Sequence, residues 1–227
     1  MKTVLWMILI SLELMAAPWH LEKEDDGITV YTREVTGSEF LEFKGIVEVD
    51  APVDAVVAFL YDTERTAEWI HDCDFGMTLE EVDFRDNYIY QTFDLPFPAS
   101  DRALILHSTL IYTLEGARLD SVAASDFCKD RETERCQRVI QNKMLMITKS
   151  KGSYSMIKTG TSKTKIIWQL HTEPGGYIPT WLANALVVDL PLYSLAKLRE
   201  MVLEPRYYKI TRRELERLWS QEYKAFH

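Results

Sequence analysis

Apolar and polar residues alternate over several stretches of the chain, and a period of two is typical of a β-strand that buries one face. The segments at 27–33 and 41–49 show this pattern first. Further strands are predicted at 88–93, 103–114, 118–124, 138–146, 152–158 and 163–171. Short links of Gly, Asn, Asp, Ser and Lys join most of them, and parallel strands need long crossovers, so the sheet is predicted to be antiparallel.

A shorter helix is predicted directly after the second strand. Asp50 or Ala51 is expected to cap it, with Pro52 in the first turn, where a missing N–H costs little. The helix is expected to continue to about Trp69. Its apolar face is predicted to hold Val56, Val57, Phe59 and Leu60.

A longer helix is predicted to begin at Pro179, after a Pro-Gly-Gly turn at 174–176. Pro191 lies inside it and is expected to kink it, and Pro205 ends or restarts it. A charged amphipathic tail follows at 206–226. One apolar stripe along the long helix is predicted to contain Trp181, Ala185, Val188, Leu192, Leu195 and Val202.

These elements predict an α+β fold, in which a curved antiparallel β-sheet wraps around a long C-terminal helix and a short helix follows the second strand. A large sheet buries its apolar face by packing against such a helix. The 227 residues, 47% of them hydrophobic, suit one domain. The sequence leaves open which face of the sheet is concave, since the two faces of 163–171 are both partly apolar.

The N-terminus has the layout of a secretory signal peptide, with Lys2 before an apolar run and small residues after it. The run is shorter than the roughly 20 apolar residues that span a bilayer. Cleavage is predicted after Ala16, which makes residues 1–16 the leader and places the mature chain in the periplasm or outside the cell. The alternative is a buried N-terminal helix of a cytosolic protein.

The formal net charge of −9 argues against a nucleic-acid partner, because an acidic surface repels phosphate backbones. Broad docking on anionic lipid is disfavoured for the same reason, although a local basic patch is compatible with the composition. A mean hydropathy of −0.17 excludes a polytopic membrane protein.

Three cysteines are present, and Cys128 and Cys136 are predicted to form a disulfide across a polar hairpin tip if the chain is exported. The alternative is two free thiols that face away from each other. Cys73 is left over and is expected to be partly buried.

Catalytic and metal-binding motifs are weak in this sequence. There is no Gly-x-Ser-x-Gly elbow and no glycine-rich phosphate loop. Residues 71–74, His-Asp-Cys-Asp, do not predict a metal site, because adjacent residues on a regular element cannot all face one ion. No cofactor is expected.

In its order of elements the chain resembles the START (lipid-transfer) family of the helix-grip superfamily, and most of all the exported bacterial members. The resemblance covers about 19–202, so the domain is placed at 19–203 and a helical tail at 204–227. Ala103 and Glu173 depart from the family, where relatives often carry aspartate. The residues that carry the resemblance are the strand at 27–33, Ala51-Pro52, Leu60-Tyr61-Asp62, Trp69, the segment 96–102 and the segment 174–184.

The resemblance implies a tunnel between the sheet and the C-terminal helix that holds one lipid or sterol-like molecule. It implies a monomer that contacts membranes transiently. Pro179 and Pro191 bracket the first half of the helix, which is expected to act as a lid over the tunnel. The ligand-binding residues are predicted to be Arg102, Tyr90, His107, Trp168, Trp181, Ala185, Val188 and Leu192.

Two questions stay open: the role of Arg102 and whether the chain is an enzyme or a docking module. Arg102 either closes a turn and pairs with a carboxylate or presents its guanidinium to a lipid head group. The chain is expected to be non-catalytic; the alternatives are a cyclase-like or hydrolase-like enzyme on the same scaffold, with His107, His171 and Arg102 as its candidates, or a module with a filled cavity that docks a protein partner.

Overall fold

The computed structural model describes the backbone of residues 17–217, so the predicted leader at 1–16 and the end of the tail lie outside the described residues. Residues 212–217 are helical. The other elements, in chain order, are β1 (His20–Asp25), β2 (Ile28–Arg33), β3 (Glu42–Val49), α1 (Val53–Tyr61), η1 (Thr63–Arg65), α2 (Thr66–Trp69), β4 (Cys73–Asp83), β5 (Asp86–Phe93), β6 (Arg102–Tyr112), β7 (Gly116–Ala123), α3 (Glu134–Gln141), β8 (Leu145–Ile147), β9 (Lys149–Gly160), β10 (Lys163–Glu173), α4 (Thr180–Met201) and α5 (Pro205–Tyr208).

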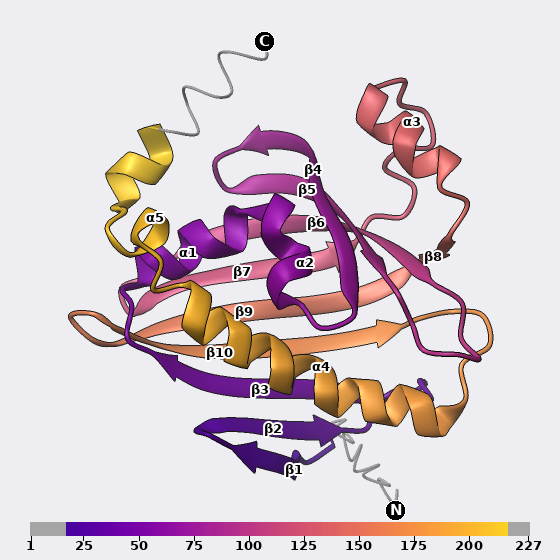
Figure 1. Cartoon of the computed structure of the whole chain (residues 1–227), viewed down its shortest axis with the longest axis horizontal. Helices are drawn as coiled ribbons and strands as arrows, with labels where there is room; N and C mark the ends of the chain where they lie inside the picture. The colour runs from indigo at the N-terminus through magenta and orange to yellow at the C-terminus, as the bar shows by residue number, and fades with distance from the viewer. Residues whose placement is uncertain (1–16, 218–227) are drawn as a thin grey trace, which may run out of the picture.

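All the strands join one 10-stranded sheet in the order β1-β2-β3-β10-β9-β7-β6-β5-β4, with the short β8 beside β6 (Figure 1). The pairings along this path are antiparallel, which confirms the predicted sheet, and β8 runs parallel to β6. β10 lies between β9 and β3, so the last strand closes the sheet against one of the first.

The strand predicted at 138–146 is wrong, because residues 138–141 belong to α3 and extended structure begins only at Leu145. The hydroxyl of Thr133 caps α3 by accepting from the backbone N–H of Cys136 at 3.2 Å. Cys136 and Val139 are its buried residues, and their spacing of three is helical rather than extended. The strand that follows, β8, is only three residues long.

Two strands were not predicted, and they form the two edges of the sheet. β1 carries mostly charged residues, which protect an exposed edge but hide the alternation. In β4 the pairing with β5 shifts register at three places, so inward and outward residues do not alternate along the strand.

The predicted helix after the second strand is broken in two. Pro52, rather than Asp50 or Ala51, is the N-cap of α1, and the helix ends before Asp62, whose ψ of 72° is not helical. The η1 turn and α2 then place Trp69 against Phe59, with ring centroids 5.1 Å apart. The break therefore directs a large aromatic side chain into the core.

The predicted helix from Pro179 is confirmed as α4, with Pro179 at its N-cap and Pro191 inside it. α4 crosses β3 closely at Gly45. A Cβ atom at this glycine would lie 2.7 Å from Leu195 Cδ1 and 3.0 Å from Pro191 Cβ, so a larger residue would push the helix away. Pro205 then starts α5, which is the predicted restart.

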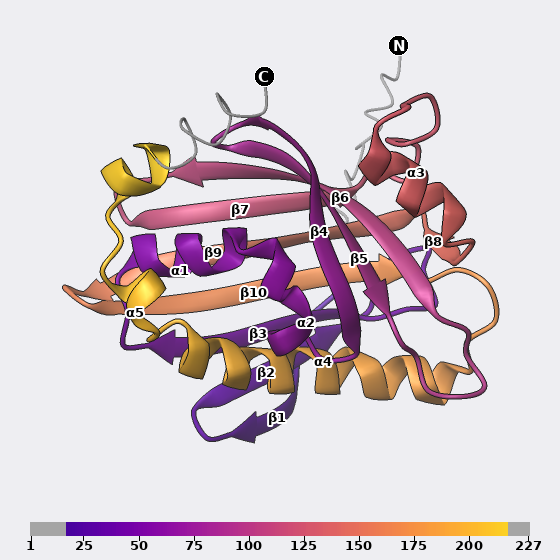
Figure 2. The same ribbon diagram turned by 45° about the horizontal axis from the view of Figure 1, so that its top comes forward.

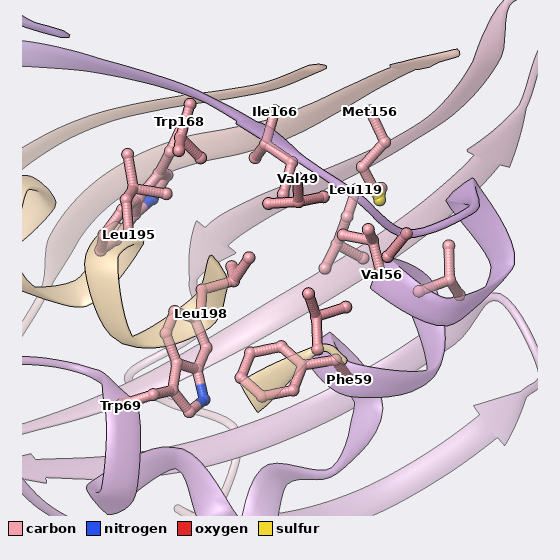
Figure 3. Close-up of a cluster of buried hydrophobic side chains, with 14 of the residues drawn as sticks. Val49, Val56, Phe59, Trp69, Leu119, Met156, Ile166, Trp168, Leu195 and Leu198 are labelled. Carbon is pink, nitrogen blue, oxygen red and sulfur yellow. The ribbon is translucent and has the colours of Figure 1, made fainter. Parts of the chain in front are cut away.

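We call the face of the sheet that carries α1, α2 and α4 the inner face, and the opposite face the outer face (Figure 2). The main core lies between the inner face and these helices, and Figure 3 shows its central side chains, among them Phe59, Trp69, Trp168 and Leu198. Tyr207 and Leu215 of the predicted tail also belong to this core. Burying each such side chain contributes about 1.5–3 kcal/mol.

Candidate functional site

The inner face has a closed end toward α1 and an open end toward the loop that joins β10 to α4. The closed end is fully packed, since Val47, Leu110, Leu119, Met156 and Ile166 are all at most 8% exposed. At the open end, inner-face side chains keep part of their surface accessible, namely Ile89, Leu106, Ala123, Leu170 and Thr172. The same strands supply both ends, so the difference arises from how the helices cover them.

The halves of α4 follow the same division. Leu195 and Leu198 in the second half, and Val202 at the C-cap, have no accessible surface. Leu186, Val187 and Leu190 in the first half are only partly buried. The open end is therefore bordered on the sheet side and the helix side by apolar side chains that protein atoms do not fully cover.

A row of small polar residues crosses the inner face beside the open end. Asn87 is paired with Ser108, Ser108 with Ser121, and Ser121 with Gly152, so all four residues lie on one face of the sheet. We call Asn87, Ser108 and Ser121 the polar row. The hydroxyls of the two serines lie 2.8 Å apart. Asn87 is 6% exposed, and its Oδ1 atom is buried without a hydrogen-bond partner among the described residues.

Tyr154 lies next to the polar row, on the strand between β7 and β10. Its ring stacks on Trp168 with centroids 5.0 Å apart, and burial raises the pKa of its phenol well above the ordinary value. Its side chain nevertheless keeps accessible surface, and its hydroxyl has no hydrogen bond within the described part of the chain. A polar group that is deep in the protein and still accessible is suited to contact a bound molecule.

Arg102 is 1% exposed, and its guanidinium contacts backbone carbonyls rather than the predicted carboxylate. Nε donates to the carbonyl of Pro174 at 2.9 Å and Nη2 donates to that of Gly175 at 2.8 Å. Nη1 donates to the carbonyls of Ser100 and Asp101. Burial lowers the pKa of Arg102. The side chain thus ties the start of β6 to the loop before α4, as its predicted turn-closing role requires.

Tyr90 and His107 lie on the outer face, away from the residues that border the open end. Tyr90 is 2% exposed and accepts a hydrogen bond from Asn142 Nδ2 at 2.9 Å. His107 stacks on Tyr88 with centroids 4.5 Å apart, and its Nε2 lies 2.8 Å from Asp86 Oδ1. Tyr90 thus helps to hold the end of α3 against the sheet, and Tyr88, between His107 and Phe127, stacks on the loop before α3.

The other predicted ligand residues are divided between core and surface. Trp168 and Leu192 are each 4% exposed in the main core, and Val188 packs against this core. Trp181 is 67% exposed, and Ala185 is exposed too. Their ligand-binding role stays a prediction, and the structure does not gather them around one point.

Cys128 and Cys136 form a disulfide, and the segment between them leads into α3 instead of forming a hairpin tip. Cys73 is a free thiol, and burial raises its pKa to about 12. Within residues 17–217 no group of three or more His, Cys, Asp or Glu side chains is arranged to hold a metal ion. None of the helices described is long and apolar enough to cross a membrane.

Two surface pockets lie away from the open end. One, of about 480 Å³, is formed by the β2–β3 loop at 34–41 together with Asn184. The other, of about 290 Å³, includes Tyr112, Lys158 and Arg212. Neither pocket is lined by the polar row or by the side chains named above at the open end, so both are separate from it.

The chain is similar to lipid-transfer proteins of bacteria and animals. A model of the START domain matches residues 6–190. An uncharacterized protein of Pseudomonas aeruginosa is 31% identical over 185 residues, 82% of this chain and 87% of that protein. The human phosphatidylcholine transfer protein is 25% identical over 175 residues, 75% of this chain and 77% of its own.

A solved structure has the same fold. The crystal structure of the STAR-related lipid transfer protein (fragment 25–204) from Xanthomonas axonopodis is 31% identical with a TM-score of 0.70, and the match covers 81% of this chain and 98% of that one. The matches confirm the family that the sequence resembles and the helix-grip arrangement of sheet and helix.

Sequence reasoning missed the polar row. The signal was available, because Ser108 and Ser121 occupy strand positions whose neighbours two residues away, Leu110 and Leu119, are apolar. A serine in the inward phase of a strand marks a place where the face is polar. That both serines and Asn87 align across three strands depends on the register, which the sequence does not state.

Proposed function

Because this chain belongs to the START domain family, we propose that it binds one lipid-type hydrophobic molecule at the open end of the inner face and transfers it without catalysing a reaction. The observation that carries the proposal is the partial exposure of apolar side chains such as Leu106, Leu170 and Leu186 beside a fully packed core. Binding sites for small molecules are mostly apolar with a few polar groups, as here.

Apolar burial supplies enough free energy for this role. Removing about 400 Å² of acyl or ring surface from water is worth about 10 kcal/mol at about 25 cal/mol per Å². Loss of translational and rotational freedom offsets a large part of that gain. The remainder corresponds to the moderate affinity that a carrier needs in order to release its ligand.

The proposed absence of catalysis is supported by the placement of the candidate catalytic residues. His107 is held by Tyr88 and Asp86 on the outer face, and the guanidinium of Arg102 donates to backbone carbonyls. The named relatives are lipid-transfer proteins. A cyclase-like or hydrolase-like activity would require reactive groups next to the open end, where Asn87, Ser108, Ser121, Tyr154 and Thr172 supply amide and hydroxyl groups.

Export and transient membrane contact complete the proposal. The pattern of residues 1–16 and the disulfide of Cys128 and Cys136 support a periplasmic or secreted carrier, since disulfides persist in oxidising compartments. Exposed aromatic side chains support membrane contact by a monomer, because aromatic residues favour the membrane interface. These are Phe97 at 93%, Tyr177 at 76% and Trp181 at 67% exposure. N-terminal sequencing of the mature protein tests cleavage after Ala16.

Native mass spectrometry of the protein purified from its own cell envelope tests the central claim. We expect one bound lipid per chain. Ala123→Phe would fill the open end and should abolish the bound mass. Val122→Phe is the matched control, because Val122 is the preceding residue, 42% exposed on the outer face. A parent protein that is empty and takes up no fluorescent sterol or fatty acid would overturn the proposal, as would equal loss in both variants.

A further inference from the structure

Within the part of the chain that the structure describes, the inner face around the polar row carries no positive charge that is free to bind an anion. On the five central strands, the inner-face positions beside the row are apolar or uncharged, as in Leu106, Ala123 and Leu170. Arg102 belongs to the same face of β6, but it is six residues from Ser108, a separation of about 20 Å along a strand. Its guanidinium already donates to backbone carbonyls.

The helices above the row do not supply a cation either. From Thr180 to Ala196, Asp189 is the one charged residue of α4. Arg65, at the end of η1, is paired with Glu68 at 2.6 Å and with Glu204 at 2.7 Å. An anionic group buried at the polar row would therefore lose its hydration without gaining a counterion, which is strongly unfavourable.

The polar row has one acceptor and one donor that form no hydrogen bond within the described residues. The buried Oδ1 of Asn87 accepts no bond from the described residues, and a buried acceptor without a donor is costly. Of the two serine hydroxyls, only one hydrogen is used in the bond between them, so the other remains available to donate. A hydroxyl group both donates one hydrogen and accepts others, and it complements both requirements.

We propose that the polar row formed by Asn87, Ser108 and Ser121 receives the hydroxyl of an uncharged lipid, and that it selects such lipids against those with a phosphate group. This rests on the proposed function and adds the chemical class of the ligand. Tyr154, beside the row, contacts the same head group. The phosphocholine head group of phosphatidylcholine offers no N–H or O–H donor to Asn87. Its phosphate needs a cation, which the row lacks.

Three lipids with identical acyl chains separate the alternatives. Purified full-length chain is titrated with 1,2-dioctanoylglycerol, dioctanoyl phosphatidate and dioctanoyl phosphatidylcholine, and binding is measured by calorimetry. We expect dioctanoylglycerol to bind at least about tenfold more tightly than the other two, the effect of about one hydrogen bond or more. Equal or tighter binding of either phosphate-bearing lipid overturns the inference, and so does binding of none. Native mass spectrometry of the lipid that co-purifies with the chain tests the proposed function separately from this selectivity.

Substitutions then assign the selectivity to the row. Asn87→Leu should weaken dioctanoylglycerol binding about tenfold without lowering the unfolding temperature, because it removes a buried oxygen that has no partner. Ser121→Ala at a partly exposed position should also weaken binding, and it provides the test if Asn87→Leu does not fold. Thr109→Val is the control, since Thr109 follows Ser108 but lies on the outer face. Unchanged affinity in both row variants would contradict the inference.

Discussion

The two halves of α4 belong to one continuous helix but have different partners. Leu195 and Leu198 in the second half, and Val202 at its C-cap, are completely buried. The residues after the helix hold this half in place, because Arg65 pairs with Glu204 and Tyr207 donates to Asp62 at 2.7 Å. In the first half Leu182 and Ala183 are buried, but no ion pair or side-chain hydrogen bond holds residues 181–190 among the described residues, and Arg102 fixes the loop before them.

The difference shows that apolar composition and burial are separate properties. The first half carries one charged residue, Asp189, and yet Leu186, Val187 and Leu190 remain partly accessible. A soluble domain that leaves such side chains uncovered commonly uses them for binding. The second half packs into the core, and we propose that the first half contacts the ligand.

The largest expected effect is a difference in stability between the two halves. Leu198→Ala should lower the free energy of unfolding by about 3 kcal/mol, because it leaves a cavity in the packed core. Leu186→Ala should lower it by less than about 1 kcal/mol, since that side chain is partly exposed. Urea denaturation measures both. Equal losses would show that the two halves are packed alike.

Arg102 provides the next test, because it secures the loop before the first half. Arg102→Met should lower the free energy of unfolding by about 2 kcal/mol, since the backbone carbonyls of Ser100, Asp101, Pro174 and Gly175 lose their donor. Hydrogen exchange at 174–178 should accelerate in the native protein. Arg102→Lys should restore part of the stability, because an ammonium group can still donate to some of these carbonyls. No change in exchange would mean that the loop is held by other contacts.

A smaller effect is expected from Pro191, which lies between the halves. Pro191→Ala restores a backbone N–H that can bond the carbonyl four residues earlier and so couples the halves more rigidly. We propose that the first half is a lid, and predict that this variant transfers a fluorescent lipid between vesicles several times more slowly, with stability changed by about 1 kcal/mol or less. Pro205→Ala, beyond the second half, is the control. Unchanged transfer in Pro191→Ala would argue against a lid.

The smallest effect concerns the ion pair at the end of the second half. Hydrogen bonding to Arg65 lowers the pKa of Glu204 below its usual 4.5. A lowered pKa in the folded state gives stability that is present above pH 4.5 and is lost as the pH falls through the folded value. Glu204→Gln should therefore flatten the decline of stability below pH 4.5 in acid titrations. Glu200→Gln on the last turn of α4 is the control. If the parent protein and both variants lost stability identically with falling pH, the proposed contribution of Glu204 would be contradicted.

Several elements were predictable because their local patterns were strong. The alternation at 163–171 and the wide apolar stripe after Pro179 identified β10 and the start of α4. The edge strands β1 and β4 were missed, because charges and shifts of register hide their alternation. At 138–146 a short apolar run fitted both periods, and the cap at Thr133 made it a helix.

The site was less predictable than the fold. Tyr90 and His107 were expected at the tunnel, and the register places them on the outer face with α3 and the disulfide loop. Tyr90 and Gln91 are adjacent along β5, but their side chains lie on opposite faces of the sheet. A ligand list based on residue type alone therefore does not distinguish the two faces of the sheet.

The sequence by itself determined the type and order of most elements, the start of α4 at Pro179 and the family, since these depend on periodicity, proline and glycine positions within short segments. Only the tertiary structure decided which face of the sheet is inner, that Asn87, Ser108 and Ser121 form one row, and that α4 has a packed half and an accessible half. The physical reason is that register and burial depend on contacts between residues far apart in the chain. Ser108 meets Ser121 through strand pairing, and Gly45 meets Leu195 across the fold.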